Sequence, residues 1–163
     1  MNRSPTVSRP TPRAVSVPSA SLTRRVTFAA AHRYRRPDWS DERNAAVFGP
    51  CARPSFHGHG YTCHVTVRGP VDPETGFCVD LPLLDRVLHD EVREPFDHRN
   101  LNIDVPEFAD GALIPTGENL ARHIAERVQR RLGAAGAGAP TVTRVVVAED
   151  ETLSATYEPE RDA

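Results

Sequence analysis

The sequence contains no lysine, and all twenty of its basic residues are arginines. This absence excludes catalysis through a lysine Schiff base, and any phosphate site must use arginine, backbone N–H groups or a metal ion. Cysteine is also scarce. Three cysteines, an odd number, argue against a disulfide scaffold and favour a reducing compartment, so we expect a cytoplasmic protein.

Long apolar runs and an excess of one charge are both missing. No run approaches the roughly 20 apolar residues that span a bilayer, and the formal net charge is −2. We therefore expect neither a membrane nor a nucleic acid as partner. Residues 1–21 are rich in Ser, Pro, Thr, Val and Arg without the apolar core of a secretory signal, which predicts a disordered N-terminal extension. Residues 22–160 are enough for a single domain.

Hydrophobic patterning predicts an α+β domain in the order strand, strand, helix, helix, strand, strand. The predicted strands are 22–31, 61–68, 141–148 and 153–157, with a short returning strand at 77–79. This order is typical of an antiparallel sheet with both helices on one face. Four strands leave the sheet with open edges, which favours pairing with another subunit.

Two helices are predicted from apolar residues at helical spacing. The first follows an N-cap at Asp80 and ends before Pro95. The second follows an N-cap at Thr116 and ends at Gly133. The remaining long segments are 33–49, a loop that can hold a short helix near 41–47, and the irregular 96–114.

Histidines form the clearest chemical pattern. His57 and His59 are two residues apart, and on a strand such residues point the same way, so both imidazoles can reach one metal ion. With His32 as a third ligand, the site would have three histidines and an open fourth position, the usual layout of catalytic zinc. Cys51 lies nearby in sequence, where it could act as a nucleophile or base, or close the site as a fourth ligand.

Six short segments, in order, match one known family. The matching segments are Phe28–His32, Phe48–Cys51, His57–His59, Phe96–Leu101, Pro115–Asn119 and Val147–Glu149. Together they resemble the 6-pyruvoyl-tetrahydropterin synthase / 6-carboxytetrahydropterin synthase family, and the resemblance runs from about residue 26 to 157. It implies a T-fold subunit (ββααββ) that assembles with other copies into an oligomeric barrel, a hexamer of two trimeric rings.

The resemblance also implies a site and a substrate, 7,8-dihydroneopterin triphosphate, which family members convert with release of triphosphate. Zinc would be held by His32, His57 and His59. Cys51 would be the general base, working with Asp97 and His98 from across a subunit interface. Glu149 would anchor the pterin ring, with Thr116 and Glu118 close by.

Two branches of the family form different products, and this sequence resembles each branch in part. Five residues between Cys51 and His57, and the segment 105–110, resemble the 6-pyruvoyl branch of tetrahydrobiopterin synthesis. Pro115 and Thr116 before the second helix, and 79–81 before the first, resemble the 6-carboxy branch, which releases acetaldehyde on the way to queuosine. The excess of Ala, Arg and Pro indicates a GC-rich bacterial genome, so we expect the 6-carboxy product, with the 6-pyruvoyl product as the alternative.

Two further interpretations stay open. The chain could be a non-catalytic zinc-binding T-fold module, whose site would be closed by Cys51. It could also be a metallohydrolase in which zinc-bound water attacks a ring, although that reaction has no role for Asp97 and His98.

The remaining histidines and cysteines are assigned no chemistry. His64, His89 and His123 match no motif and are predicted to lie on exposed faces. Cys63 shares the strand face of His59 and is expected to pack in the core, and Cys78 is expected to be structural.

Overall fold

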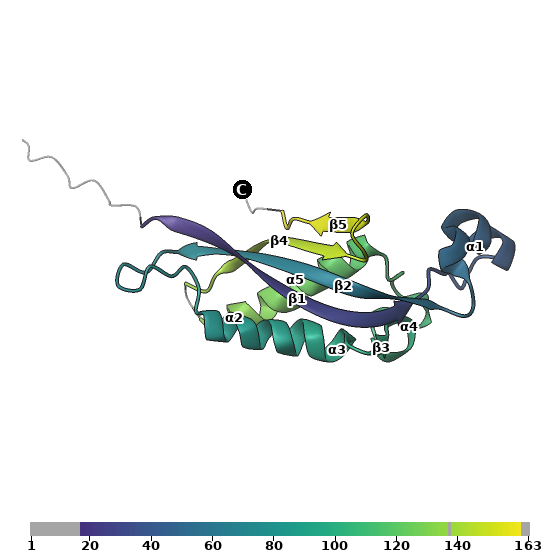
Figure 1. Cartoon of the computed structure of the whole chain (residues 1–163), viewed down its shortest axis with the longest axis horizontal. Coiled ribbons are helices and arrows are strands. Elements are labelled where there is room, and N and C mark those ends of the chain that lie inside the picture. Colours follow the sequence, from purple (N-terminus) through teal and green to yellow (C-terminus); the bar gives the residue numbers. More distant parts are fainter. Residues whose placement is uncertain (1–16, 137, 161–163) are drawn as a thin grey trace, which may run out of the picture.

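The computed structural model describes residues 17–136 and 138–160. Its main feature is a five-stranded sheet in the order β3-β1-β2-β4-β5, antiparallel except for the β1–β3 pair. The strands are β1 (Ser19–His32), β2 (His57–Pro70), β3 (Arg99–Asn100), β4 (Thr141–Ala148) and β5 (Ser154–Tyr157). Figure 1 shows β1 and β2 as long paired strands, with the main helices on one side of the sheet. The α+β class predicted from the sequence is confirmed.

The β1–β2 ladder is longer at both ends than predicted. Ser19 pairs with Pro70, so β1 begins inside the expected N-terminal extension instead of at residue 22. Residues 1–16, most of that extension, lie outside the described residues. The last pair of the ladder joins His32 to His57, which places both histidines at the same end of the sheet.

The first long helical segment passes through Pro95, so the prediction that it ends before this proline is wrong. It consists of α2 (Leu81–Leu88), a π-helical turn η2 (His89–Arg93) and α3 (Glu94–Phe96). The Asp80 carboxylate caps it by accepting from the N–H of Leu83, as predicted. In the π turn the N–H of Glu94 donates to the carbonyl of His89, five residues back, so Pro95 enters a helix whose bonding register has already changed.

The second long helix, α5 (Gly117–Gly133), has the predicted boundaries and cap. The Thr116 hydroxyl accepts from the N–H of Asn119. Its apolar stripe packs on β4 and β5, together with α2, over one face of the sheet. His123 belongs to this buried face, so its predicted exposure is wrong. It lies three residues after the buried Leu120 and against Phe108, with ring centroids 5.2 Å apart.

The buried face of the sheet continues along β1 and β2. Tyr61 and Cys63 are buried on β2, and Phe28 of β1 stacks on Tyr61 with ring centroids 4.9 Å apart. The core role expected for Cys63 is confirmed. Residues 77–79 do not form the expected returning strand. The carbonyl of Cys78 packs where a side chain at Gly69 would stand, so position 69 requires glycine.

Short elements fill the two long segments. The first contains α1 (Asp41–Phe48), as predicted, and the 3₁₀ turn η1 (Gly49–Ala52). The second contains β3, α4 (Leu101–Asp104) and the 3₁₀ turn η3 (Ala109–Gly111), and so has more regular structure than expected. Within the described ranges no helix combines the length and the apolar character needed to cross a membrane.

Candidate metal centre and its cavity

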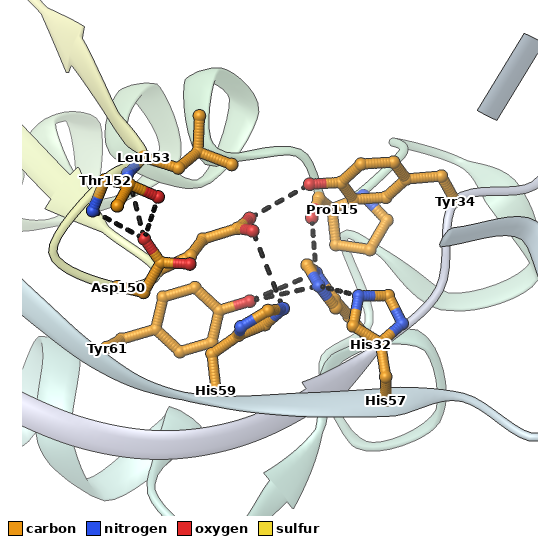
Figure 2. A network of polar contacts seen from close by, with 10 residues as sticks. His32, Tyr34, His57, His59, Tyr61, Pro115, Asp150, Thr152 and Leu153 are labelled. Carbon is orange, nitrogen blue, oxygen red and sulfur yellow. Dashed lines mark hydrogen bonds and ion pairs between the residues drawn. The ribbon is translucent and has the colours of Figure 1, made fainter. Parts of the chain in front are cut away.

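Three histidines meet at the end of the β1–β2 ladder. His32 is the last residue of β1, His57 is its register partner on β2, and His59 lies two residues further along β2 on the same face. Each offers a ring nitrogen, and these three atoms all lie within 4.8 Å of one another. Figure 2 shows the three imidazoles converging on one point. The cluster predicted from the sequence is therefore formed.

The surroundings of His32 favour the form of imidazole that binds a metal. Its Nδ1 lies 2.9 Å from the carbonyl of Pro115, which can only accept, so Nδ1 carries the proton and Nε2 is left with its lone pair. That Nε2 faces Nε2 of His57 at 3.1 Å. Burial, followed by the neighbouring imidazoles, lowers the pKa of His32 to about 4, so the ring is neutral at pH 7.

His59 provides a test of whether a metal ion fits. Its Nε2 is buried and has no hydrogen-bond partner among the residues that the structure describes, although the carboxylate of Glu149 lies 3.5 Å away. A buried nitrogen without a partner is costly, and a metal ion shared with His32 and His57 would satisfy it. Three imidazole nitrogens suit zinc and related divalent ions. The residues therefore fit a metal ion.

A cavity of about 330 Å³ adjoins the histidines. Its walls come from segments distant in the sequence: the segment after β1, the end of α1, the start of α5 and the β4–β5 turn. The lining residues are Tyr34, Val47, Phe48, Thr116, Gly117, Glu118, Val147, Glu149, Leu153, Ser154 and Ala155. The three predicted substrate-binding residues, Glu149, Thr116 and Glu118, are thus brought together in one cavity.

Glu149 links this cavity to the histidines. Its carboxylate is only 7% exposed, and Oε1 accepts a hydrogen bond of 2.9 Å from the hydroxyl of Tyr34. Burial first, and then Glu149, raise the pKa of Tyr34, which keeps the hydroxyl protonated as a donor. The turn that carries Glu149 is held by Asp150, whose Oδ1 accepts from the N–H and the hydroxyl of Thr152 at 2.6 and 2.7 Å.

Tyr34 and Tyr61 were not identified from the sequence. Tyr61 places its hydroxyl 3.1 Å from Nδ1 of His32. Both tyrosines stand two residues after a histidine of the cluster, Tyr34 after His32 and Tyr61 after His59, and this spacing was the available signal.

Cys51 lies on η1, beside the cavity, with its carbonyl accepting from the N–H of Tyr34 at 2.8 Å. Its sulfur does not belong to the group of ligand atoms within 4.8 Å, which contains the three histidines. Burial and the nearby Glu149 carboxylate raise the pKa of the Cys51 thiol. A proton-accepting thiolate at this position therefore needs an additional positive charge.

Asp97 and His98 are placed elsewhere in the chain. Asp97 Oδ1 accepts from the N–H of Ala29 at 2.8 Å, and the N–H of His98 donates to the carbonyl of Ala29 at 2.6 Å. The His98 side chain is 85% exposed and lies 4.0 Å from the Asp97 carboxylate. It borders a surface hollow that is also lined by His59, but neither Asp97 nor His98 belongs to the group of ligand atoms within 4.8 Å. One chain therefore does not bring this pair into the histidine cluster.

Known proteins share the sequence features of this chain. A model of the family described as 6-pyruvoyl tetrahydropterin synthase matches residues 21–160. The chain belongs to this family. Members of the family are pterin synthase lyases, and the resemblance noted in the sequence is confirmed.

Individual relatives support the same assignment. The human 6-pyruvoyl tetrahydrobiopterin synthase is 42% identical over 113 residues, which cover 69% of this chain and 77% of the relative. The 6-carboxy-5,6,7,8-tetrahydropterin synthase of Bacillus subtilis is 34% identical over 115 residues, covering 69% and 73%. The structure of Caenorhabditis elegans 6-pyruvoyl tetrahydropterin synthase superposes with a TM-score of 0.79 at 30% identity, covering 88% of this chain and 98% of the other. The T-fold is therefore confirmed, and the oligomeric barrel stays a prediction.

Proposed function

We propose that this chain is a zinc-dependent 6-pyruvoyl tetrahydropterin synthase, which converts 7,8-dihydroneopterin triphosphate into 6-pyruvoyl-tetrahydropterin and triphosphate. The observation that carries the proposal is the three-histidine cluster joined through Glu149 to a cavity. The choice of product differs from the sequence-based expectation. The human relative named for the 6-pyruvoyl product is 42% identical, whereas the Bacillus subtilis relative named for the 6-carboxy product is 34% identical.

The proposed reaction needs neither water nor an external oxidant. The two hydrogens gained by the pterin ring balance the oxidation of C1′ from an alcohol to a ketone. Elimination of triphosphate from C3′ balances the oxidation of C2′, because C2′ becomes a ketone while C3′ becomes a methyl group. The protein therefore has to bind a ring, remove protons from carbons that carry hydroxyls, and accommodate a highly charged leaving group.

His32, His57 and His59 would hold the zinc ion at the side-chain end of the substrate. A bound zinc ion supplies Lewis acidity that polarises substrate oxygens and makes protons on neighbouring carbons easier to remove. The Pro115 carbonyl fixes the His32 ring in the tautomer that presents Nε2 to the metal. The open fourth position is consistent with catalysis because Cys51 is outside the ligand group.

Glu149 would bind the pterin ring. A carboxylate can accept two parallel hydrogen bonds, here from the 2-amino group and N3–H of the pterin. The Tyr34 hydroxyl would keep the carboxylate in position while leaving it lone pairs for the ring. Thr116 and Glu118 line the same cavity, and the ring of Phe48 gives it an aromatic wall.

Cys51 would remove a side-chain proton, and Asp97 with His98 would come from a neighbouring copy in a hexamer. A site shared in this way between two copies accounts for two features of the single chain. The Cys51 thiol has a raised pKa, and the His98 side chain is exposed. A zinc ion and a protonated His98 would together favour the thiolate. The Asp97 carboxylate, held by Ala29, would orient His98.

The deciding experiment is incubation of the zinc-loaded protein with 7,8-dihydroneopterin triphosphate, with the products identified by mass spectrometry. A pyruvoyl product with inorganic triphosphate is expected. Carboxypterin with acetaldehyde would instead support the 6-carboxy alternative. Recovery of unchanged substrate from folded, zinc-loaded protein would exclude both lyase activities and favour the non-catalytic module. A hydrolysed ring would support the metallohydrolase.

A further inference from the structure

A second cavity, of about 360 Å³, lies beside the end of the β1–β2 ladder. Its lining residues are Arg33, Arg35, Pro37, Phe56, Asn102, Ile103 and Gly111. The last pair of the ladder is His32 with His57. Arg33 directly follows the first of these histidines and Phe56 directly precedes the second, so the cavity starts one residue from the metal centre on both strands.

Arg33 provides an uncompensated positive charge in this cavity. Within the described residues it forms no ion pair with a carboxylate, and its guanidinium lies over the ring of Phe56, 4.9 Å from the centroid. Stacking of this kind holds the guanidinium plane while leaving its edge free to donate hydrogen bonds. The Arg33 backbone is fixed by Asn102, which accepts from its N–H at 2.8 Å and donates to its carbonyl at 3.1 Å.

Phe56 is held in an unusual conformation that supports this arrangement. Its φ of 57° lies in the left-handed region, which residues other than glycine seldom adopt. Backbone strain of this kind persists where the surrounding structure requires it, commonly at binding sites. Here it places an aromatic ring against Arg33 at the position next to His57.

Arg35 adds a second positive charge. Its guanidinium contacts Asp41 at 2.9 Å, but that carboxylate is 83% exposed, so water weakens the pairing and the arginine can turn to another anion. The alternation of side chains separates the two cavities. Tyr34 lines the first cavity, whereas Arg33 and Arg35 line the second.

We propose that the arginine cavity, defined by Arg33, Arg35 and Phe56, binds the phosphate chain of the substrate. The identity of the ligand rests on the proposed function. The reacting carbons of a pterin triphosphate lie between its ring and its phosphates. In the chain, His32 is followed first by Arg33 of the arginine cavity and then by Tyr34 of the Glu149 cavity, so both cavities begin within two residues of a histidine of the cluster. Arginine donates two parallel hydrogen bonds to a phosphate group, and in a chain without lysine it is the available cationic side chain.

The test is calorimetric titration of the full-length protein with inorganic tripolyphosphate. Arg33→Gln is expected to weaken binding about tenfold or more, because it removes a charged, bidentate donor. Arg144→Gln is the control, since Arg144 lies on β4 beside the exposed Glu158. Tripolyphosphate also chelates zinc, but both variants keep the three histidines, so chelation affects them equally. Unchanged affinity in Arg33→Gln would overturn the proposal.

A second variant allows the same test if the first variant does not fold. If Arg33→Gln proves unstable, Arg35→Gln leaves the Phe56 stack intact and gives up an ion pair to an exposed carboxylate, so it is expected to fold. It should also bind tripolyphosphate several-fold more weakly, and wild-type affinity would again count against the cavity.

Turnover separates this inference from the proposed function. In an active enzyme, Arg33→Gln should raise KM for the pterin triphosphate about tenfold and leave the affinity for unphosphorylated dihydroneopterin unchanged. An active enzyme with unchanged KM would contradict the arginine cavity alone. Arg33-dependent tripolyphosphate binding without turnover would support the cavity as an oligophosphate site and contradict the proposed lyase.

Discussion

His57 is one of the two part-buried members of the histidine cluster, and its substitution tests the candidate metal centre directly. We expect His57→Ala to weaken zinc binding more than about 100-fold and to abolish turnover, because losing only an outer-shell partner already costs about 10–100-fold. His64→Ala, on the same strand β2 but outside the ligand group, should retain both. The measurement is zinc content by mass spectrometry beside activity. Full zinc occupancy in His57→Ala would show that the ligand assignment is wrong.

Tyr34 acts through the carboxylate of Glu149, 115 positions away in the sequence. Tyr34→Phe keeps the ring but removes the 2.9 Å hydrogen bond, and bonds to charged acceptors contribute about 1.5–3 kcal/mol. We expect pterin affinity to fall roughly tenfold, with zinc content unchanged. Fluorescence titration of a pterin measures this, with Tyr157→Phe on the edge strand β5 as control. Equal affinity in the two variants would remove Tyr34 from pterin binding.

His123 makes stability depend on pH. Burial, with Arg127 nearby, lowers its pKa below the ordinary 6.5, although Glu107 acts in the opposite direction. The unfolded chain therefore binds a proton first as pH falls, and His123 contributes stability that is present above pH 6.5 and lost below it.

Replacing His123 with leucine should remove this contribution and fill the site beside Phe108. The urea midpoint of His123→Leu should fall less steeply than that of the wild type between about pH 7 and 5. His89→Leu, at an exposed histidine, should keep the wild-type slope. Parallel slopes for all three proteins would contradict the buried, neutral state of His123.

The residue-scale predictions from the sequence succeeded where the pattern was local. The spacing of His57 and His59 follows from the geometry of one strand, so the cluster could be predicted. Tyr34 could not, because its role depends on a carboxylate from a distant strand. His123 has a polar side chain on a helix, and only its packing against Phe108 shows that it is buried.

The π turn η2 shows how a neighbouring element overrides a local rule. In an α-helical register, Pro95 would leave the carbonyl of Glu91, four residues earlier, without its N–H donor. Arg127 of α5 donates to that carbonyl instead, at 3.2 Å, and its guanidinium also lies 2.9 Å from the Glu91 carboxylate. The sequence rule that a helix stops before proline fails here because the compensating donor comes from α5. The boundaries of α5 itself, set by Thr116 and Gly133, were predictable because they depend on local capping.

Arg127→Met tests this contact between the two helical segments. The substitution keeps most of the apolar stem and removes the donor to a partly buried carbonyl, so we expect a loss of about 1–3 kcal/mol in the free energy of unfolding. Arg122→Met is the matched control on the same helix, since its ion pair with Glu126 is exposed and worth about 0–1 kcal/mol. Chemical denaturation compares the two. A similar, small effect in both variants would mean that Arg127 does not compensate for Pro95.

At the scale of the whole molecule, one chain holds the histidine cluster and the Glu149 cavity but leaves Asp97 and His98 outside them. The family resemblance predicted that these two residues belong to the site, and the proposed function accounts for their position by placing them in the site of a neighbouring copy. The backbone N–H of His98 donates to the Ala29 carbonyl beside the edge strand β3, and its imidazole is exposed, so the proposal places this imidazole in a neighbouring copy.

Mixing two inactive variants tests whether the site is shared. Cys51→Ala and His98→Ala are each expected to lose turnover while keeping zinc. If every site takes Cys51 from one copy and His98 from another, random mixed oligomers contain intact sites, and activity should return to about a quarter of the wild-type value. Subunits are exchanged by mild denaturation and renaturation of the mixture, with each variant treated alone as control. If both residues act within one chain, every site in the mixture carries a defect, and the mixture stays as inactive as its parents.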